Sequence, residues 1–562
     1  MRKPWVWLFL IALTAAPVRP QGAGAVEPGA VQQQSNVTQK YYGLQDQVQE
    51  PKEPLKPGET VIDNTAPASN QPLPGGGPTF ELRGVETNPS AILTPAELQQ
   101  VTGRYENRNV NIGDLRKMVE EINDLYKQKG YITARAFLPP QSIDQGVVHV
   151  DLVEGRVGQV EVTGNAHTVP GYYTRRVGLS PGDLVDTGPL EKSMVRFNQT
   201  SDTRLRAVLA AGSEFGTTNV DLEAVEPKNI TTTLSADTAG YNLVGRNRIG
   251  LTVVDRSLFG HRDALTVGTY WASGTVATNI QYEVPVGTSG AYISSSVNRN
   301  QISYRSGALS QLGVTGHFWN YSINYRRPVF VTRRTLLEVY AGPNYQRSIL
   351  QSPSLQIRNA WISYMRFGNT LRRYDQNGLL QWDNSFSAGE QHVTGSYGFL
   401  KYNGNLTRMR NLPGGLVAVF RAMGQVRLAG GGVRLPAAQQ FQLGGISTVR
   451  GYPLGTLIGD NGYMVSSELD TPLPFARANM FDNALARRLK LAFFLEHGAV
   501  MQSGNHSFLT GVGGGFILNF SRSLTGRVNL AVPLQNRANI KHLDFEFYLQ
   551  TVPPWEKLFH RN

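Results

Sequence analysis

The residue whose chemistry most needs a partner is Arg450, which lies in the glycine-punctuated stretch Gln442–Tyr452. It is flanked by Val449, Gly451 and Tyr452, and the segments on either side alternate apolar and polar residues. A guanidinium group binds a carboxylate through two parallel hydrogen bonds, so an Arg450 removed from water requires an acid nearby.

Two glutamates are candidates for that acid. In the segment that ends at Gly498, leucine and phenylalanine occupy alternate positions. If that apolar set faces lipid, Phe494, Glu496 and Gly498 face the inside of a barrel, and the same parity turns Glu468 inward. A long external loop that folds back would bring Arg450 to either carboxylate and act as a lock. The alternative is a solvated arginine above acids that only line water, an arrangement contributing about 0–1 kcal/mol.

Several classes of site are excluded by composition and motif. The 562 residues include no cysteine, which excludes disulfides, thiolate metal sites and cysteine nucleophiles. The nine histidines lack metal-ligand spacing, and no G-x-S-x-G, H-E-x-x-H or G-x-x-x-x-G-K-[ST] motif occurs. We therefore expect neither an enzyme nor a bound metal or cofactor. The net charge of +12 fits nucleic acid, anionic lipid headgroups or an arginine-lined channel, and composition alone does not choose among them.

The N-terminus indicates export. Residues 1–25 begin with Arg2 and Lys3, continue through the apolar run Trp5–Ala16 and end in small residues. That run is too short for a transmembrane helix, so a secretory signal peptide cleaved after Ala25 is favoured over a membrane anchor or a buried helix. Because no later run of about 18 apolar residues follows, the product is expected to be secreted, periplasmic or part of an outer membrane.

Three further segments precede the alternating region. Residues 26–78 are rich in proline and are predicted to be an extended linker, in which the proline-free segment 31–50 could form a short polar helix. Residues 79–155 are predicted to be a small α+β domain, with a helix capped by Thr94. Residues 156–228 repeat that plan in degenerate form.

Residues 229–552 show about sixteen segments in which apolar and polar residues alternate, and residues 553–562 form a tail. In the last segment Phe545, Phe547 and Leu549 alternate with polar residues. A soluble sandwich or propeller would also alternate, but it would not need so many aromatics on the apolar face. We predict a transmembrane β-barrel of about sixteen antiparallel strands, preceded by two small α+β domains. The loop that contains Arg450 follows the eleventh strand and should therefore lie outside the cell.

These sequences resemble a known family. The stretches Gly444–Tyr452, Gly459–Tyr463 and Ser467–Leu469 are similar to the sixth extracellular loop and following strand of two-partner secretion transporters of the haemolysin secretion/activation type. That family lies within the outer-membrane insertase superfamily. The two modules resemble its POTRA domains, and Gly130–Gln141 and Val153–Gly155 match the first of them.

The resemblance implies a location and a partner for Arg450. In the family, the arginine of a V-R-G-Y/F motif lies inside the barrel and meets the acid of an F-x-D-x-G motif on strand thirteen. This chain has Phe494-x-Glu496-x-Gly498, so its acid is one methylene longer. A plug helix is also implied, and it would have to lie at residues 31–50.

The function expected from the resemblance is that of an outer-membrane transporter. It would recognise one large exported partner through periplasmic POTRA domains and pass it through the barrel to the cell surface. The implied partners are a β-rich, adhesin- or cytolysin-like cargo, outer-membrane lipid and the barrel-assembly machinery, with no nucleic acid. The alternatives are an insertase of the same superfamily, which usually carries three or more POTRA domains, and a passive porin, which does not need such modules.

Overall fold

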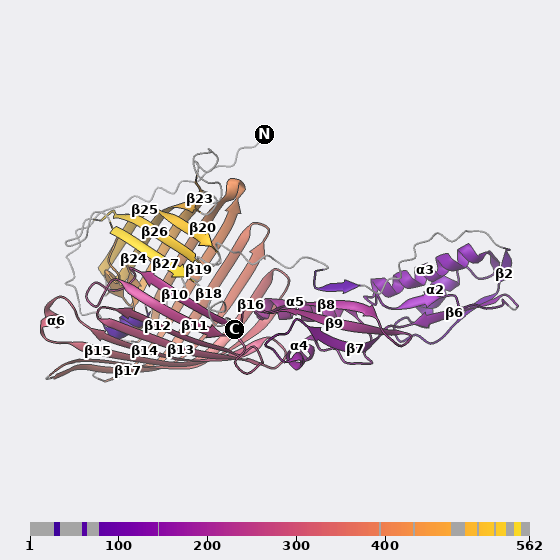
Figure 1. The fold of residues 1–562 in the computed structure, drawn as a ribbon, viewed down its shortest axis with the longest axis horizontal. Helices are drawn as coiled ribbons and strands as arrows, with labels where there is room; N and C mark the ends of the chain where they lie inside the picture. Colours follow the sequence, from indigo (N-terminus) through magenta and orange to yellow (C-terminus); the bar gives the residue numbers. More distant parts are fainter. Residues whose placement is uncertain are drawn as a thin grey trace, which may run out of the picture.

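The chain forms a barrel with two small modules at one end (Figure 1). The computed structural model describes residues 27–33, 59–63, 78–143, 145–353, 355–392, 395–430, 433–473, 489–502, 505–521, 524–535 and 544–551. The predicted signal peptide (1–25) and C-terminal tail (553–562) lie outside these residues. No helix in the described ranges is long and apolar enough to cross a membrane.

The first module is an α+β unit packed around the inner face of its longer helix. Its elements are β2 (Phe80–Leu82), β3 (Gly84–Thr87), α2 (Pro95–Thr102), β4 (Arg108–Val110), α3 (Ile112–Gln128), β5 (Arg135–Phe137) and β6 (Val147–Val153). Capping boxes start both helices, with Thr94 and Glu97 at α2 and Asn111 and Asp114 at α3. The buried residues of α3 recur at helical spacing and face the sheet β3-β6-β5.

The second module repeats this plan and recruits a strand from the linker. Its elements are β7 (Arg156–Thr163), α4 (Pro170–Val177), α5 (Thr187–Thr200), β8 (Arg204–Ala211) and β9 (Thr217–Val225). The short strand β1 (Val61–Asp63) pairs with β8 in parallel and extends the sheet to β1-β8-β9-β7. The predicted extended linker therefore contributes three residues to a folded sheet.

The barrel is closed by sixteen strands, each antiparallel to its neighbours, which confirms the predicted fold class. They are β10 (Ile230–Asp237), β11 (Arg248–Asp255), β12 (Ala264–Ala272), β13 (Thr275–Val286), β14 (Ala291–Ser303), β15 (Thr315–Val331), β16 (Thr335–Ser352), β17 (Leu355–Asp375), β18 (Gly378–His392), β19 (Ser396–Leu412), β20 (Leu416–Ala429), β23 (Asn461–Pro472), β24 (Leu489–Gln502), β25 (Asn505–Ser521), β26 (Leu524–Pro533) and β27 (Asp544–Thr551). A short helix, α6 (Ala308–Gln311), lies in the loop between β14 and β15.

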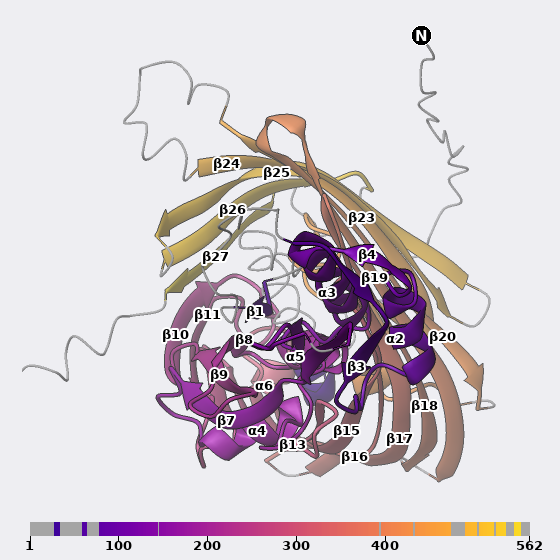
Figure 2. The same ribbon diagram turned by 90° about the vertical axis from the view of Figure 1, so that its right-hand side faces the viewer.

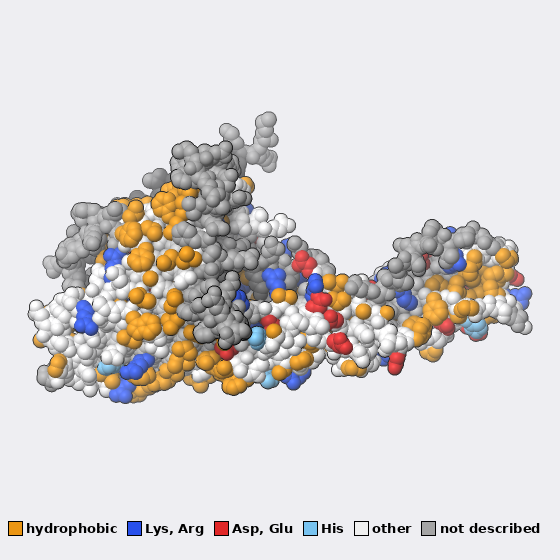
Figure 3. Space-filling model, in the orientation of Figure 1, with side chains coloured by type: hydrophobic (Ala, Val, Ile, Leu, Met, Phe, Trp, Pro, Cys, Tyr) orange, Lys and Arg blue, Asp and Glu red, His pale blue; other side chains and the backbone are white. Residues whose placement is uncertain are grey.

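The strands separate an apolar exterior from a polar lumen. Exposure alternates along residues 493–496 of β24. Phe493 and Leu495 are each 53% exposed, whereas Phe494 and Glu496 are buried. Large apolar side chains cover much of the outer surface (Figure 3). This alternation is the one expected of strands that face lipid on one side and a polar interior on the other.

The second module is attached to the turns at one mouth of the barrel (Figure 2). Arg262, in the turn between β11 and β12, forms an ion pair with Asp202, and the Val169 N–H donates to the Gly260 carbonyl at 2.9 Å. Arg333, in the turn between β15 and β16, forms an ion pair with Glu191 of α5. The loops after odd-numbered barrel strands, including the one that carries Arg450, therefore belong to the opposite mouth.

Candidate functional site in the barrel lumen

The segment between β20 and β23 folds inward as a hairpin. Its strands β21 (Phe441–Leu443) and β22 (Leu457–Gly459) pair with each other inside the barrel. Apolar side chains of the hairpin pack against wall residues that include Met464, Val500 and Leu509. The hairpin therefore brings its tip, residues 444–456, into the lumen.

Glycine conformation shapes the tip. Gly444 and Gly445 have φ values of 105° and 91°, which L-residues with a side chain rarely adopt. The Gly445 N–H donates to the Tyr452 carbonyl at 2.8 Å, and the Thr448 hydroxyl donates to the Gly444 carbonyl at 2.9 Å. These bonds close a compact turn that presents Arg450 toward the wall.

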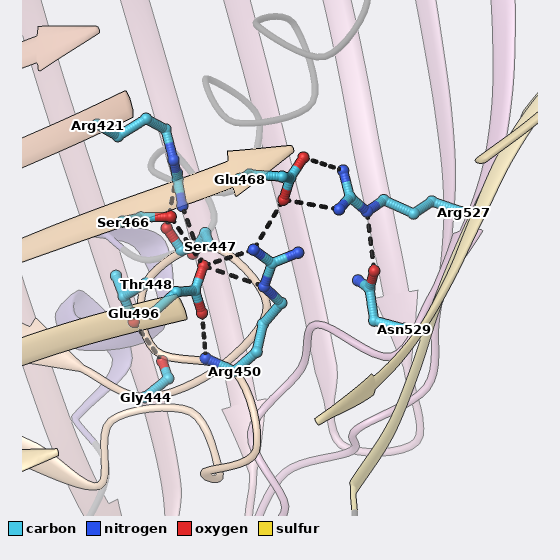
Figure 4. A network of polar contacts seen from close by, with 10 residues as sticks. All are labelled: Arg421, Gly444, Ser447, Thr448, Arg450, Ser466, Glu468, Glu496, Arg527 and Asn529. Carbon is cyan, nitrogen blue, oxygen red and sulfur yellow. Dashed lines mark hydrogen bonds and ion pairs between the residues drawn. The ribbon is translucent and has the colours of Figure 1, made fainter. Parts of the chain in front are cut away.

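Arg450 is 0% exposed and makes three hydrogen bonds to Glu496 of β24 (Figure 4). Its backbone N–H donates to Oε2 at 2.7 Å, and its Nε and Nη2 donate to Oε1 at 3.0 and 2.7 Å. The glutamate thus binds both the side chain and the main chain of the arginine. Charge-assisted bonds of this kind are about twice as strong as neutral ones.

Glu468 of β23 is the second carboxylate of the site. It accepts a 2.8 Å hydrogen bond from Arg450 Nη2. It also binds Arg527 of β26 through two bonds, from Nη1 at 2.8 Å and from Nη2 at 2.7 Å. Arg527 Nε in turn donates to Asn529 Oδ1 at 2.9 Å. Arg450 therefore bridges both glutamates identified in the sequence, and one of them is already held by a wall arginine.

A third arginine completes the network. Arg421 of β20 donates to the Ser447 carbonyl at 3.1 Å, and its Nη2 lies 3.6 Å from Glu496 Oε1. Ser466 of β23 donates to the same Glu496 oxygen at 3.2 Å. The charged groups thus alternate in the order Arg421, Glu496, Arg450, Glu468, Arg527 across four strands and the loop (Figure 4).

The other motif residues position this network. The Phe494 ring lies 3.4 Å from the guanidinium carbon of Arg450, a cation–π contact. A Cβ on Gly498 would lie 3.0 Å from both methyl carbons of Leu443, so glycine allows the hairpin to pack on β24. Gly451 has a φ of 90° and passes close to the backbone of β26.

Val449 and Tyr452 anchor the tip on either side of the arginine. Both are fully buried and belong to the apolar cluster between hairpin and wall. The Tyr452 hydroxyl donates to the Thr510 carbonyl at 2.9 Å and accepts from the Gln535 N–H at 3.0 Å. All four residues of the Val449–Tyr452 motif therefore contact the wall or pack against it.

A second segment occupies the lumen beside the hairpin. Residues 28–33 are helical, so helix begins before the predicted segment 31–50, most of which lies outside the described residues. The Asn300 side chain donates to the Pro28 carbonyl at 3.1 Å, and Glu27 pairs with Arg358. On its other side, Gln33 donates to the Gln440 carbonyl at 2.8 Å. The segment therefore contacts both the wall and the hairpin.

Three residues of the site were not singled out from the sequence. Arg421 and Arg527 alternate with outward apolar neighbours, so the parity that turned Glu468 inward would have found them. On β25, a Cβ at Gly511 would lie 2.2 Å from the Arg450 carbonyl oxygen. That glycine lets the loop backbone reach the wall, and no local pattern marks it.

The arrangement is suited to holding the loop against the barrel wall. Its carboxylates already bind arginines, and the described residues include no cluster of three His, Cys, Asp or Glu that could hold a metal. What the geometry can do is hold or release a loop.

Comparison with known proteins gives the class. The profile of the ShlB-type POTRA domain matches residues 80–155, and that of the haemolysin secretion/activation protein ShlB/FhaC/HecB matches residues 216–518. With the closed sixteen-stranded barrel, these matches define a two-partner secretion transporter of the outer membrane, with its POTRA domains in the periplasm. The chain belongs to the haemolysin secretion/activation protein ShlB/FhaC/HecB family. That family consists of transporters for exported partner proteins rather than enzymes.

Relatives cover most of the chain. It is 24% identical over 508 residues to the heme/hemopexin transporter protein HuxB of Haemophilus influenzae, covering 84% of this chain and 86% of HuxB. It is 24% identical over 421 residues to the outer membrane transporter CdiB of Dickeya dadantii, covering 70% and 73%. The solved structure of CdiB from Escherichia coli has the same fold, with a TM-score of 0.64 at 17% identity, covering 95% of this chain and 100% of that one.

Proposed function

We propose that this transporter recognises one exported partner protein through its periplasmic modules and passes it, unfolded, through the barrel to the cell surface. Release of the Arg450 loop from the wall is the opening step. Glu496 and Glu468 are the wall residues that hold the loop in the resting state.

The observation that supports this proposal is that two segments lie inside the lumen and are held to its wall by polar contacts. The hairpin is held at its tip by the charge network, and residues 27–33 are held by side-chain amides and one ion pair. Polar partners of this kind can be exchanged for water or for the backbone of a passing chain, because one hydrogen bond contributes a net stabilisation of only about 0.5–1.5 kcal/mol between neutral groups and about 1.5–3 kcal/mol to a charged group. A wall of such groups suits an unfolded polypeptide.

The two segments are coupled to each other. Gln442 of the hairpin donates to the Gln33 side chain at 3.2 Å, in addition to the bond from Gln33 to the Gln440 carbonyl. When the hairpin moves, residues 27–33 lose these contacts and keep those to the wall. Loop release therefore weakens the second obstruction as well as removing the first.

The wall arginines lower the free energy needed for release. A buried carboxylate left without a partner costs about 3–5 kcal/mol. When Arg450 leaves, Glu468 keeps both bonds to Arg527, and Glu496 keeps Arg421 at 3.6 Å. The lock therefore opens without leaving either glutamate without an arginine.

The modules are placed to deliver the partner. The second module lies at the periplasmic mouth and the first extends from it away from the barrel (Figure 1), and β8 already accepts β1 as an added parallel strand. An extended partner segment can bind a sheet edge by the same main-chain hydrogen bonds. Strand addition is thus the recognition mode that this fold supports best.

The test is a secretion assay in a Gram-negative host. The chain is co-expressed with the exported protein encoded beside its gene, and partner at the cell surface is measured by its sensitivity to added protease. We expect surface partner with the intact chain and periplasmic partner with a variant that lacks residues 80–225. Partner that reaches the surface in cells without this chain would show that it is not the transporter. The amount of an unrelated outer-membrane barrel that assembles is also measured in cells with and without this chain. Equal amounts show that the membrane is undamaged, whereas a loss without this chain would support the insertase alternative.

A further inference from the structure

A line of five side chains crosses the outer surface of five adjacent strands, β14 to β18. Each is the direct partner of the next in the strand register. In order around the barrel they are Arg299, Trp319, Arg347, Trp361 and His392. Because partners across neighbouring strands point to the same face, the five form one continuous outward row, called here the arginine–tryptophan row.

The row lies toward the extracellular end of the barrel. Strand β14 runs away from the periplasmic modules, so Arg299 lies in its extracellular half. Its lumen-side neighbours Asn298 and Asn300 are buried, while Arg299 and Arg347 are exposed. The row therefore faces the surroundings of the barrel and not its lumen.

The row marks a boundary between an apolar band and a polar rim. One step toward the periplasm, the outward residues of β14, β15 and β16 are Val297, Tyr321 and Tyr345, and those of β17 and β18 are Ser363 and Glu390. One step outward, they are Gln301, His317, Ile349 and Asn359, so these residues are polar except on β16. A step of two residues is about 6.6 Å along a strand. The arginines thus lie where apolar side chains give way to polar ones, the depth of lipid headgroups in an outer-membrane barrel.

The geometry of the arginines suits phosphate. The guanidinium carbon of Arg299 lies 4.9 Å from the centre of a Trp319 ring, and a guanidinium stacked in this way keeps donors at its edge. Arg347 donates from Nε to Asn359 Oδ1 at 3.4 Å, and this bond orients the guanidinium group of Arg347. The two arginines stand two strands apart, about 10 Å between backbones, with a tryptophan between them. Guanidinium groups bind phosphate oxygens through paired hydrogen bonds.

The charges around the row favour an anion at the β14–β16 side. His317 lies one step beyond Trp319, between the strands of the two arginines, and His392 lies at the far end, stacked on Trp361. The acid nearest that end is Glu390, whose carboxylate is 3.5 Å from His392. In Figure 3, acidic side chains gather near the junction with the modules, where basic ones also lie, and further basic ones lie toward the opposite end of the barrel.

We propose that the arginine–tryptophan row is a binding site for the phosphorylated headgroup of outer-leaflet glycolipid. Arg299 and Arg347 bind its phosphates, and Trp319 and Trp361 lie at the level where headgroup meets acyl chain. The site fixes the depth and the orientation of this sector of the barrel in the membrane. It is independent of the lumen lock, because it lies on the opposite face of the strands.

The test measures binding of lipid A to the purified full-length protein in detergent by native mass spectrometry. The joint variant Arg299→Gln with Arg347→Gln is compared with Arg327→Gln, an outward arginine of β15 at the periplasmic end. We expect the joint variant to lose about tenfold or more in affinity for diphosphorylated lipid A, since two charge-assisted contacts are removed. The control should bind as the unchanged protein does.

A second arm needs no substitution. The unchanged protein is titrated with diphosphorylated and with monophosphorylated lipid A, and the diphosphorylated form should bind more tightly. Equal affinity for the two lipids, or equal loss in the joint variant and in Arg327→Gln, overturns the proposal, because either result indicates non-specific attraction. Thermal unfolding of each variant shows whether the barrel is intact.

Discussion

Ion pairs attach the Arg450 loop to the barrel wall and the second module to the barrel turns, and the two sets of ion pairs differ in burial. In the lumen, Arg450, Glu496 and Glu468 are almost completely removed from water. At the junction of barrel and modules, the side chains of Arg333 and Glu191 are 36% and 34% exposed. Water and salt weaken the second attachment far more than the first. We therefore expect the lumen network to act as a lock and the junction to act as a hinge that can bend.

The largest effect is expected from Glu496→Ala. It removes the acceptor of three bonds from Arg450 and should weaken loop docking by about 3–5 kcal/mol, the usual cost of breaking a buried pair. Because the chain has no cysteine, Ser447→Cys gives one reporter that is fully buried. Its reaction rate with a water-soluble maleimide should rise by about a hundredfold or more.

Two variants accompany that measurement. Ser306→Cys, on an exposed loop, should react at the same rate in both backgrounds. Glu496→Asp keeps the charge but shortens the side chain by one methylene. The labelling rate of Ser447→Cys in this variant should therefore fall between the rates with Glu496 and with Glu496→Ala. Unchanged protection of Ser447→Cys in Glu496→Ala would mean that the apolar cluster alone holds the loop.

Substitution of Arg527 is expected to strengthen the docking of the loop rather than weaken it. Arg527→Gln leaves Glu468 with Arg450 as its remaining arginine, so the loop should be held more tightly and the Ser447→Cys reporter should react more slowly, by about tenfold. Arg421→Gln is compared with Arg527→Gln, because Arg421 binds the loop itself through the carbonyl of Ser447, in addition to lying near Glu496. Faster labelling in Arg527→Gln would show that this arginine only supports the wall.

An intermediate effect is expected at the junction for Arg262→Ala. The Arg262 side chain is 2% exposed although Asp202 is 42% exposed, so this pair is half way between the two extremes. Its loss should cost about 1–2 kcal/mol and widen the range of module positions. Spin labels at Ser213→Cys and Thr288→Cys would show a broader distance distribution. A distribution as narrow as before would mean that backbone contacts alone fix the second module.

The smallest effect is expected from Arg333→Ala. An ion pair that is about one third exposed contributes about 0–1 kcal/mol and is screened by salt. The same spin-label distances should change only slightly at low ionic strength and not at all at high ionic strength. An effect as large as that of Arg262→Ala would remove the distinction between hinge and lock.

Strong, repeated patterns made much of the fold predictable. Alternation recurs along the barrel strands, so residues 229–552 could be predicted to form a barrel of about sixteen strands. The same parity turned Glu496 and Glu468 inward as possible partners of Arg450, and the resemblance implied Glu496 as the partner. The linker strand β1 was not foreseen, because three residues carry no periodic signal and their pairing partner lies far along the chain.

The rest of the site depends on how the strands wrap around the lumen. Arg527 reaches Glu468 from a strand that is not adjacent to β23, and a linear sequence does not give that distance. Gly511 matters only because the loop backbone passes it closely. The helical residues 28–33 are too few for a pattern, and their place is set by contacts with β14 and the hairpin.

Charge exchange tests most directly whether the bond between Arg450 and Glu496 controls secretion. Surface display of the partner is measured for Arg450→Glu, for Glu496→Arg and for the joint exchange. We predict that each single reversal impairs secretion and that the joint exchange recovers part of it. Recovery is partial because Arg421 and Glu468 then face like charges. Normal secretion by both single variants, or a joint variant no better than either, would contradict the account.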